Sequence, residues 1–294
     1  MAAGTSDALH DPRHDAQQVL GAGRFARVLE PSPPAVDDGD FFADDPVRAE
    51  APAGTPVVSP VPGADVSSTW SEWLADPARA EYAAWAAERW LGAYRRLPPA
   101  PATLVDTRLA LHRLAGYVIS PARRRMNTKI GLRFTRGGFG TPFFGAGEQV
   151  RVAGTVLVRQ RAGTADAEPV STLAAAAKFV LDGPPDVEWA QGFDVPPLGD
   201  PDEDLAVDPV AAAFLGDWYG FTWSVLEELR SDAGATDAGR VQLWPEHFDA
   251  AFDCLPDHRR ITFGASPGDA AIPEPYLYAL PWNLDRDDPD LWNA

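Results

Sequence analysis

The sequence predicts an α+β fold: N-terminal helices, a central strand pair, a long helix and C-terminal antiparallel strands. Three observations support this class. Apolar residues recur with helical spacing before residue 125, alternating apolar runs occupy the middle, and short strand-like runs follow a long apolar helix. The chain has 294 residues, of which 45% are hydrophobic, which is ample for a core. We expect one α+β domain over residues 66–294.

Residues 1–65 differ from the rest in composition. They contain Pro-rich and acidic runs such as EPSPPAVDDGDFFADDP. Such segments bury too little apolar surface to offset the ordering of the backbone, so we expect a mostly disordered tail. Its Phe41–Phe42 dipeptide is the part suited to docking on the domain. Binding of a partner by the tail is the functional alternative to a solvated extension.

Two helices are predicted at the start of the domain. Asp76–Pro77 is typical of a helix N-terminus, and apolar spacing continues from there to Leu97. Thr103 begins the second helix, and Pro121 limits it because proline cannot continue the hydrogen-bond ladder.

The middle of the chain carries strand patterns. KIGLRFT (129–135) alternates apolar and polar residues, as a half-buried strand does. GGFGTPFFGAG (137–147) is expected to be a loop, either an aromatic lid or a hairpin loop packed by its phenylalanines. In QVRVAGTVLVRQR (149–161) the valines are expected to share one strand face, with Gly154 at a bulge or a close backbone approach. These valines are Val150, Val152, Val156 and Val158.

The second half begins with an Ala-rich helix over 172–181 and an acidic loop over 182–208. Asp208–Pro209 caps a long helix. Its predicted apolar stripe is Val210, Phe214, Phe221, Val225 and Leu229, with Trp218 beside it. Gly216 and Gly220, four residues apart in this helix, favour close packing. Four short strands are expected after it, at 240–244, 246–253, 259–264 and 275–281. The segment 246–253 also fits a short helix, because Phe248 and Phe252 lie four residues apart.

Charge and cysteine content exclude several classes of protein. The net charge is −18, and an acidic surface repels phosphate backbones, which argues against general nucleic-acid binding. We see no signal peptide and no apolar run long enough to span a membrane, so we expect a cytoplasmic protein. Cys254 is the single cysteine, and we expect a buried thiol rather than a nucleophile.

Charge is also segregated along the chain. Residues 107–147 contain basic but no acidic side chains, whereas residues 179–229 contain acidic but no basic ones. The two segments either face each other, lie separately in solvent, or leave an anion-binding groove beside the first strand. The candidate anion-binding residues are Arg123, Arg124, Lys129 and Arg133.

The closest spacing of His, Asp and Glu beside aromatic residues lies in 244–282. If 246–253 is a strand, His247, Asp249 and Asp253 share one face. Such a group supplies metal ligands or a general base oriented by a carboxylate, and a third ligand would be His258, Asp269 or Glu274. If the segment is helical, Glu246 replaces His247 on that face. A plain polar surface is the other interpretation.

The loop SPGDAAIPEPYLY carries turn signals. Ser266–Pro267–Gly268–Asp269 has the Pro and Gly of a type II turn. Two prolines fix the backbone on both sides of Glu274, which suits either a site residue or a carboxylate that accepts buried backbone N–H groups.

Several blocks of the chain resemble a known kind of protein. LHRLAGYVISPARR, KIGLRFTRGGFGTPFFG, VSTLAAAAKFV and LGDWYGF resemble segments of uncharacterised actinobacterial proteins. QLWPEHFDAAFD and FGASPGDAAIPEPYLY are similar also to the C-terminal end of a broader bacterial domain family of unknown function. The resemblance spans roughly residues 66–294 and implies a bacterial cytoplasmic setting. It assigns no activity and therefore no catalytic residues.

Three functions are compatible with these patterns. The leading one is a small-molecule binding protein whose pocket is lined by aromatic residues and C-terminal carboxylates. The second is a metal-assisted hydrolase that uses His247, Asp249 and Glu274, with Asp269 as support. The third is an interaction protein that uses its acidic loop and tail. Reaction, cofactor and oligomeric state do not follow from the sequence.

Overall fold

The computed structural model describes residues 97–135, 137–161, 164–191, 193–230, 234–255 and 260–282, together with Pro77. The predicted tail (1–65) and nearly all of the predicted helix at 77–97 lie outside these residues. The described part is α+β, as predicted. It contains a five-stranded antiparallel sheet in the order β1-β2-β3-β4-β5 and a four-stranded antiparallel sheet in the order β6-β7-β8-β9.

The helical elements of this part of the chain are α4 (Leu104–Leu114), η3 (Ala115–Ile119, a π-helix), α5 (Ser120–Asn127), α6 (Leu173–Leu181), α7 (Val187–Ala190) and α8 (Pro209–Arg230). The strands of the first sheet are β1 (Arg133–Thr135), β2 (Gly138–Gly140), β3 (Glu148–Ala153), β4 (Val156–Arg161) and β5 (Thr164–Pro169). Those of the second sheet are β6 (Gln242–Trp244), β7 (Asp249–Cys254), β8 (Ile261–Ser266) and β9 (Tyr276–Pro281).

The second predicted helix begins where expected, but it does not stop at Pro121. It continues as α4, η3 and α5 to Asn127. Pro121 has no N–H for the carbonyl of Tyr117, and that carbonyl instead accepts a hydrogen bond of 2.9 Å from the N–H of Asp186. The π-turn and this outside donor therefore let the helix pass a proline.

The run 149–161 is a hairpin and not one strand. β3 and β4 pair with Ala153 opposite Val156, and the chain turns at Gly154, which has a φ of 61°. Val152 therefore shares a face with Leu157, whereas Val156 lies on the other face, so the predicted common valine face is wrong. After the turn at Gly154, the valines of β4 point to the opposite face from the valines of β3. An alternating apolar pattern alone does not reveal such a turn.

The glycine-rich segment contains a strand, β2, where a loop was predicted. Its phenylalanines Phe139, Phe143 and Phe144 are all buried, which agrees with the packed alternative and not with a lid. Gly140 lies opposite Arg151, and a Cβ at Gly140 would lie 2.5 Å from the Cβ of Arg151. Glycine is therefore needed where this strand meets β3.

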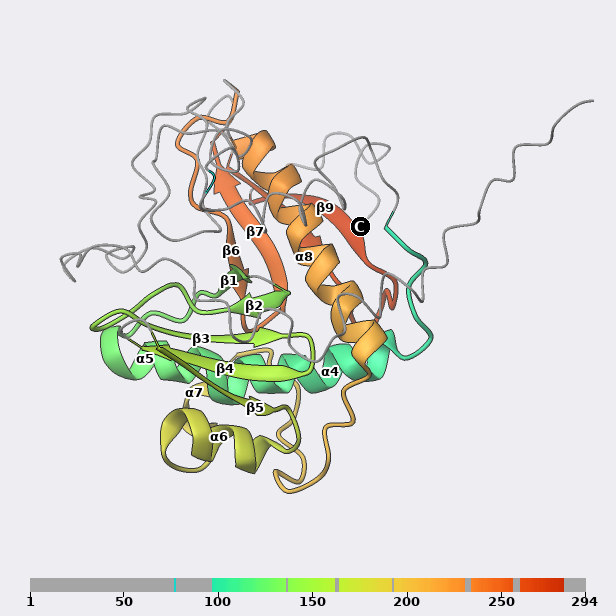
Figure 1. The fold of residues 1–294 in the computed structure, drawn as a ribbon. Helices are drawn as coiled ribbons and strands as arrows, with labels where there is room; N and C mark the ends of the chain where they lie inside the picture. Colours follow the sequence, from blue (N-terminus) through green and yellow to red (C-terminus); the bar gives the residue numbers. More distant parts are fainter. Residues whose placement is uncertain are drawn as a thin grey trace, which may run out of the picture.

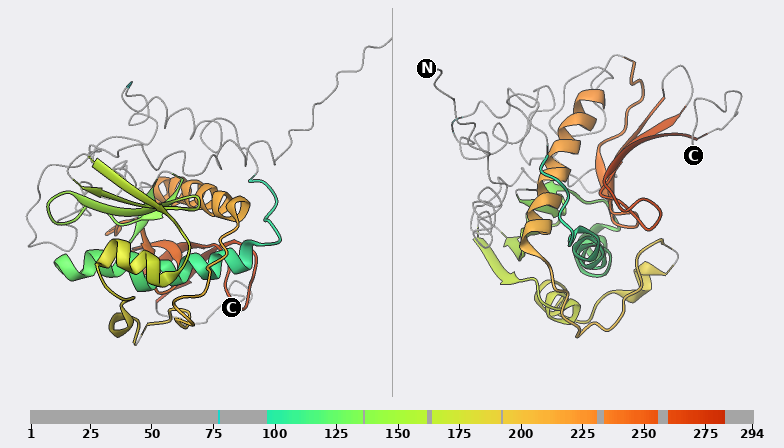
Figure 2. Two further views of the ribbon diagram at one scale, coloured as in Figure 1. Left: turned by 60° about the horizontal axis from the view of Figure 1, so that its bottom comes forward. Right: turned by 90° about the vertical axis from the view of Figure 1, so that its right-hand side faces the viewer.

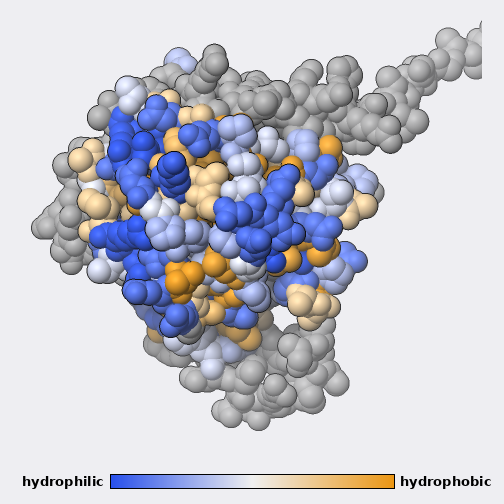
Figure 3. Space-filling view, turned by 90° about the horizontal axis from the view of Figure 1, so that it is seen from below, coloured by the Kyte–Doolittle hydropathy of each residue, from blue (hydrophilic) through white to orange (hydrophobic). Residues whose placement is uncertain are grey.

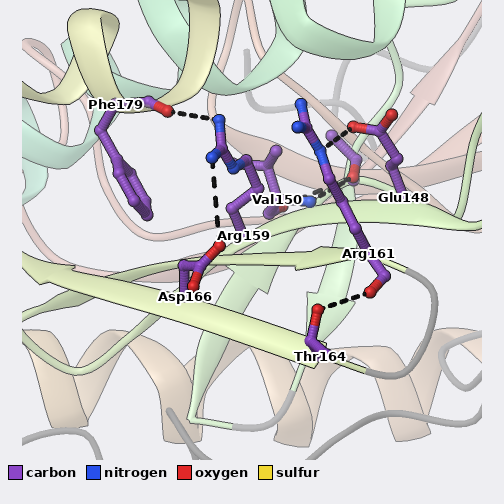
Figure 4. A network of polar contacts seen from close by, with 8 residues as sticks. Glu148, Val150, Arg159, Arg161, Thr164, Asp166 and Phe179 are labelled. Atoms are coloured by element: carbon purple, nitrogen blue, oxygen red, sulfur yellow. Dashed lines mark hydrogen bonds and ion pairs between the residues drawn. The ribbon is translucent and has the colours of Figure 1, made fainter.

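Polar contacts tie β4 of the first sheet to α6 (Figure 4). Arg159 donates a 2.8 Å hydrogen bond to the carbonyl of Phe179, and its guanidinium carbon lies 5.1 Å from the ring centroid of that residue. Across the hairpin, Arg161 and Glu148 form an ion pair of 2.7 Å. α6 begins after Thr172, whose side chain caps the helix by accepting the N–H of Ala175.

α8 contacts strands of both sheets and also α4. Figure 1 and the right-hand view of Figure 2 show α8 alongside the curved four-stranded sheet, with α4 below it. The predicted cap is confirmed, since Asp208 accepts the N–H of Ala211 at 2.9 Å. The predicted close packing at Gly216 is confirmed as well, because a Cβ there would lie 2.9 Å from the backbone of Gly137.

The predicted stripe of α8 is wrong at both ends, where Val210 and Leu229 are exposed. The buried side carries larger aromatic residues instead, Trp218, Tyr219 and Trp223. Two sheets cover this helix, so its buried side is broader than one amphipathic stripe.

The C-terminal strands agree with the prediction except at 246–248, which form part of a turn between β6 and β7. The two sheets are joined by a bridge between Leu132 and Leu243, whose backbone groups exchange hydrogen bonds of 2.8 and 2.9 Å. Cys254 is buried on β7, as expected.

Candidate functional site

The candidate site lies where the turn before β7 meets α4 and α8. The turn occupies residues 245–248, between Trp244 and its strand partner Asp249. Phe248 ends it with a left-handed φ of 58° although the side chain is fully buried. A non-glycine residue in that region costs on the order of 1–3 kcal/mol and persists only where its surroundings hold it.

Aromatic packing and one hydrogen bond hold Phe248 in place. Its ring stacks on His112 of α4 at 5.1 Å and meets Phe139 edge-on at 5.0 Å. The hydroxyl of Tyr219 on α8 donates a 2.7 Å hydrogen bond to the Phe248 carbonyl. The turn therefore delivers the next residue, Asp249, in a defined position.

Asp249 is only 6% exposed. Its Oδ2 accepts a hydrogen bond from the Tyr278 hydroxyl, whereas its Oδ1 is buried and accepts none from the described residues. Burial raises the pKa of Asp249, against the opposing effects of the Tyr278 hydrogen bond, the nearby His247 and the residue's own backbone N–H. Burial and the Asp249 charge raise the pKa of Tyr278, so this hydroxyl keeps its proton and acts as the donor.

A glycine makes the Tyr278–Asp249 contact possible. Tyr278 of β9 pairs with Gly264 of β8, which in turn pairs with Ala251 of β7. A Cβ at Gly264 would lie 2.2 Å from the Cζ atom of Tyr278. The bare strand lets the tyrosine ring lie across the sheet toward Asp249.

Glu246 adds a second carboxylate from the turn. Its Oε2 is buried and has no hydrogen-bond partner among the described residues. Burial raises the pKa of Glu246, and the charge of Asp249 adds to this, whereas His247 and a backbone hydrogen bond oppose it. His247 itself is exposed.

Arg108 of α4 holds the loop that follows β8. Its guanidinium donates to three backbone carbonyls, those of Pro267 (3.2 Å), Pro273 (3.0 Å) and Asp269 (3.1 Å). Gly268 between them has a φ of 98°, as the predicted type II turn requires. This loop leads into β9 and so positions Tyr276 and Tyr278.

Asp269 is a structural residue of this loop. Its carboxylate accepts the N–H groups of Ala271 and Ile272 at 2.7 and 2.8 Å and the Tyr276 hydroxyl at 2.5 Å. The Tyr276 hydrogen bond is the main cause that lowers the pKa of Asp269. Glu274 is exposed, so its interpretation as a buried acceptor of backbone N–H groups is wrong, and Asp269 has that role instead.

The predicted group of His247, Asp249 and Asp253 does not share a strand face. β7 starts only at Asp249, and His247 lies in the exposed turn. Asp253 lies on the same face of β7 as Asp249, but it accepts a 2.5 Å hydrogen bond from the hydroxyl of Thr262. The helical alternative for 246–253 is wrong as well. Within the described residues, no three His, Cys, Asp or Glu side chains are arranged to hold a metal ion; His258 lies outside them.

The candidate anion-binding residues are largely buried. Arg123 donates a 2.5 Å hydrogen bond to the carbonyl of Gly131, and Lys129 and Arg133 are 7% and 1% exposed. Arg124 is half-buried. The two charged segments do pack against each other: α4 contacts α8, and Arg125 forms a 3.2 Å ion pair with Asp186.

The residues that sequence reasoning missed are Arg108, Tyr219 and Tyr278; Glu246 was considered only for a helical 246–253. The alternation Tyr276–Leu277–Tyr278 in a predicted strand was the available signal for two inward tyrosines. Arg108 gave no signal, because its partners are backbone carbonyls more than 150 residues further along the chain. His112 of α4 is a packed residue: burial lowers its pKa to about 4, and its Nε2 lies 3.0 Å from the Pro245 carbonyl oxygen.

A pocket of about 290 Å³ lies elsewhere, between α4, α6 and the segment before α8. Its lining differs from the expected aromatic one, and consists of Asp106, Leu109, Ala110, Arg113, Leu173, Asp200, Glu203, Asp204 and Leu205. The lower face of Figure 1, seen in Figure 3, is mainly hydrophilic with scattered hydrophobic residues.

Comparison with known proteins adds no assignment. No family model, no curated protein and no solved structure matches the chain. The resemblance drawn from the sequence blocks therefore stays a prediction. Among the described residues no helix, α8 included, has the length and apolar character needed to cross a bilayer.

Proposed function

We infer that the protein binds a small molecule at the Asp249 site, which we define as Glu246, Asp249, Tyr276 and Tyr278. The observation that carries this proposal is the buried Oδ1 of Asp249, which has no hydrogen-bond partner in the described part of the chain. An ionisable group so placed weakens the fold, because its desolvation is not compensated. Such groups concentrate at binding and catalytic sites.

The surroundings of Asp249 support binding rather than a purely structural role. Other carboxylates in the same region differ from Asp249: Asp269 accepts three hydrogen bonds, and Asp253, which accepts the Thr262 hydroxyl, is only half-buried. Asp249 in contrast keeps a buried oxygen without a hydrogen-bond partner among the described residues. The turn and loop that flank it are held by Tyr219 and Arg108, so the site is fixed in shape before any ligand binds.

The metal-assisted alternative has less support. Asp249 offers an oxygen of the kind that hard divalent ions prefer, but structural and catalytic zinc sites use three or more protein ligands. The described residues show no such group. We therefore place metal ions among the test compounds and not at the centre of the proposal.

The test is a thermal-shift screen of the full chain against amines, neutral amides and alcohols, carboxylates, phosphate, and the chlorides of zinc, manganese and magnesium. Wild type is compared with Asp249→Asn and with Asp253→Asn, a matched change four residues along the same strand. A compound that raises the Tm of wild type and Asp253→Asn, but not of Asp249→Asn, supports the proposal. Equal shifts in all three proteins, or none in wild type, would reject it.

A further inference from the structure

The Asp249 site has unused hydrogen-bond acceptors but no unused donors of its own among the contacts described. The hydroxyls of Tyr278 and Tyr219 already donate, to Asp249 Oδ2 and to the Phe248 carbonyl. Arg108 directs its guanidinium at three loop carbonyls. Asp249 Oδ1 and Glu246 Oε2 are the buried oxygens left over. A ligand that completes this site must therefore bring N–H or O–H donors.

Both oxygens belong to buried carboxyl groups, which carry negative charge when they are ionised. Glu246 and Asp249 lie close enough for the Asp249 charge to oppose ionisation of Glu246. His247, the basic residue that favours both ionised carboxylates, is exposed to solvent. Arg108 is engaged with the loop backbone. Ionised carboxylates that are buried and close together require a positive counter-charge, so a cationic donor fits better than a neutral one.

The cation is organic rather than a metal ion. The described residues assemble no group of three metal ligands. They do supply aromatic surface: the half-buried rings of Tyr276 and Tyr278 on one face of β9 lie 6.2 Å apart, tilted by 50°. Tyrosine faces attract cations and cover the apolar part of an organic molecule.

We propose that the Asp249 site binds an organic cation with two or more N–H donors, a protonated amine, amidine or guanidine, whose charge pairs with Asp249 and Glu246. This inference rests on the proposed small-molecule function and specifies its ligand class. The buried, unpaired Asp249 Oδ1 is the primary anchor, and Glu246 is the second acceptor.

The experiment uses two matched series of probes on the full chain, measured by isothermal titration calorimetry. One is benzamidinium, benzamide and benzoate, and the other is butylammonium, butanol and butyrate. Each series keeps size and shape nearly constant while the charge changes from positive to neutral to negative. We expect the cation of at least one series to bind more tightly than its partners.

Variants connect that preference to the site. Asp249→Asn and Glu246→Gln should each weaken cation binding by at least about tenfold, because each loses a charge-assisted hydrogen bond. Asp253→Asn should bind as wild type does. If Asp249→Asn does not fold, Glu246→Gln gives the readout on its own, and far-UV circular dichroism identifies which variants are folded.

The outcomes separate the two proposals. If the neutral or anionic probe binds at least as tightly as the cation, and this binding depends on Asp249, the proposal of a cationic ligand is rejected. The proposal of small-molecule binding then still stands. If cation binding is unchanged in Asp249→Asn and Glu246→Gln, the cation does not bind at the Asp249 site. If none of the six probes binds at millimolar concentration, the proposal of a cationic ligand is rejected. The broader thermal-shift screen then decides whether the protein binds a small molecule of another class.

Discussion

Gly268 lies directly against the guanidinium group of Arg108. A Cβ at this glycine would lie 2.2 Å from Nη1 of Arg108 and 2.3 Å from the carbonyl oxygen of Pro273, and the φ of Gly268 is 98°. The glycine and the arginine thus depend on each other. One leaves the space, and the other fills it with donors for three carbonyls of the same loop.

Gly268→Ala should destabilise the protein by about 2 kcal/mol or more, because alanine is strained at positive φ and its Cβ displaces the guanidinium. Urea unfolding measures the loss. Gly183→Ala is the control, since the nearest atom to a Cβ there is 3.8 Å away. Equal stability of the two variants would show that the loop adapts and that Arg108 does not hold it.

Arg108→Met should cost on the order of 3 kcal/mol, because it leaves loop carbonyls without donors. Arg125→Met, which removes an exposed ion pair with Asp186, should cost at most about 1 kcal/mol. Chemical unfolding of the two variants side by side tests the difference. Similar values would mean that water replaces the guanidinium without loss.

The difference in unfolding free energy between Asp249→Asn and wild type should shift in favour of the variant as the pH rises. The raised pKa means that the folded state holds a proton that the unfolded state has already lost, so wild-type stability falls as the pH rises above the ordinary value of 3.8. The amide keeps an acceptor for Tyr278 and carries no charge. Unfolding free energies of both proteins between pH 4 and 7 check this. A constant difference between them would contradict it.

His112 gives a pH dependence of the opposite sign. Burial lowers its pKa from 6.5 to about 4, so between these values the unfolded state binds a proton that the folded state does not. Wild-type stability should therefore fall as the pH drops through that window, by up to about 1.4 kcal/mol per pH unit. His112→Gln should lack this contribution. The NMR titration of the His112 ring gives the midpoint directly, and a midpoint near 6.5 would refute the burial argument.

Metal content discriminates the hydrolase hypothesis. We expect purified, untagged protein to contain well below one equivalent of zinc, manganese or iron, because the described residues do not converge on a metal. Elemental analysis measures this. About one equivalent, lost in His247→Ala with the fold retained, would restore the metal-assisted alternative.

The fold was predictable where the signal is local. The cap at Asp208 and the close approach at Gly216 were predicted from residue chemistry within a few positions. The errors arise where a distant group decides. Pro121 interrupts no helix because Asp186 supplies the missing donor, and the valine pattern of 149–161 hides a turn at Gly154.

The candidate site was predictable only in part. Closely spaced acids and aromatics pointed to 244–282, and Asp249 is at its centre. The role of Asp249 depends on Tyr278, which reaches it across Gly264, and on a left-handed Phe248 that no residue pattern signals. Strand pairing and α4 packing, which join segments far apart in the chain, determine which carboxylates stay unpaired.

The π-turn at Ala115–Ile119 has a consequence for how this chain tolerates change in length. A π-turn contains one residue more than the α-helical turn it replaces. Deletion of one residue there would convert it to an α-turn and leave α5, with Arg123 facing inward, in its present orientation. Deletion anywhere in α4 or α5 would instead rotate the following residues by about 100°. We therefore expect natural length variation in this helix to concentrate at Ala115–Ile119.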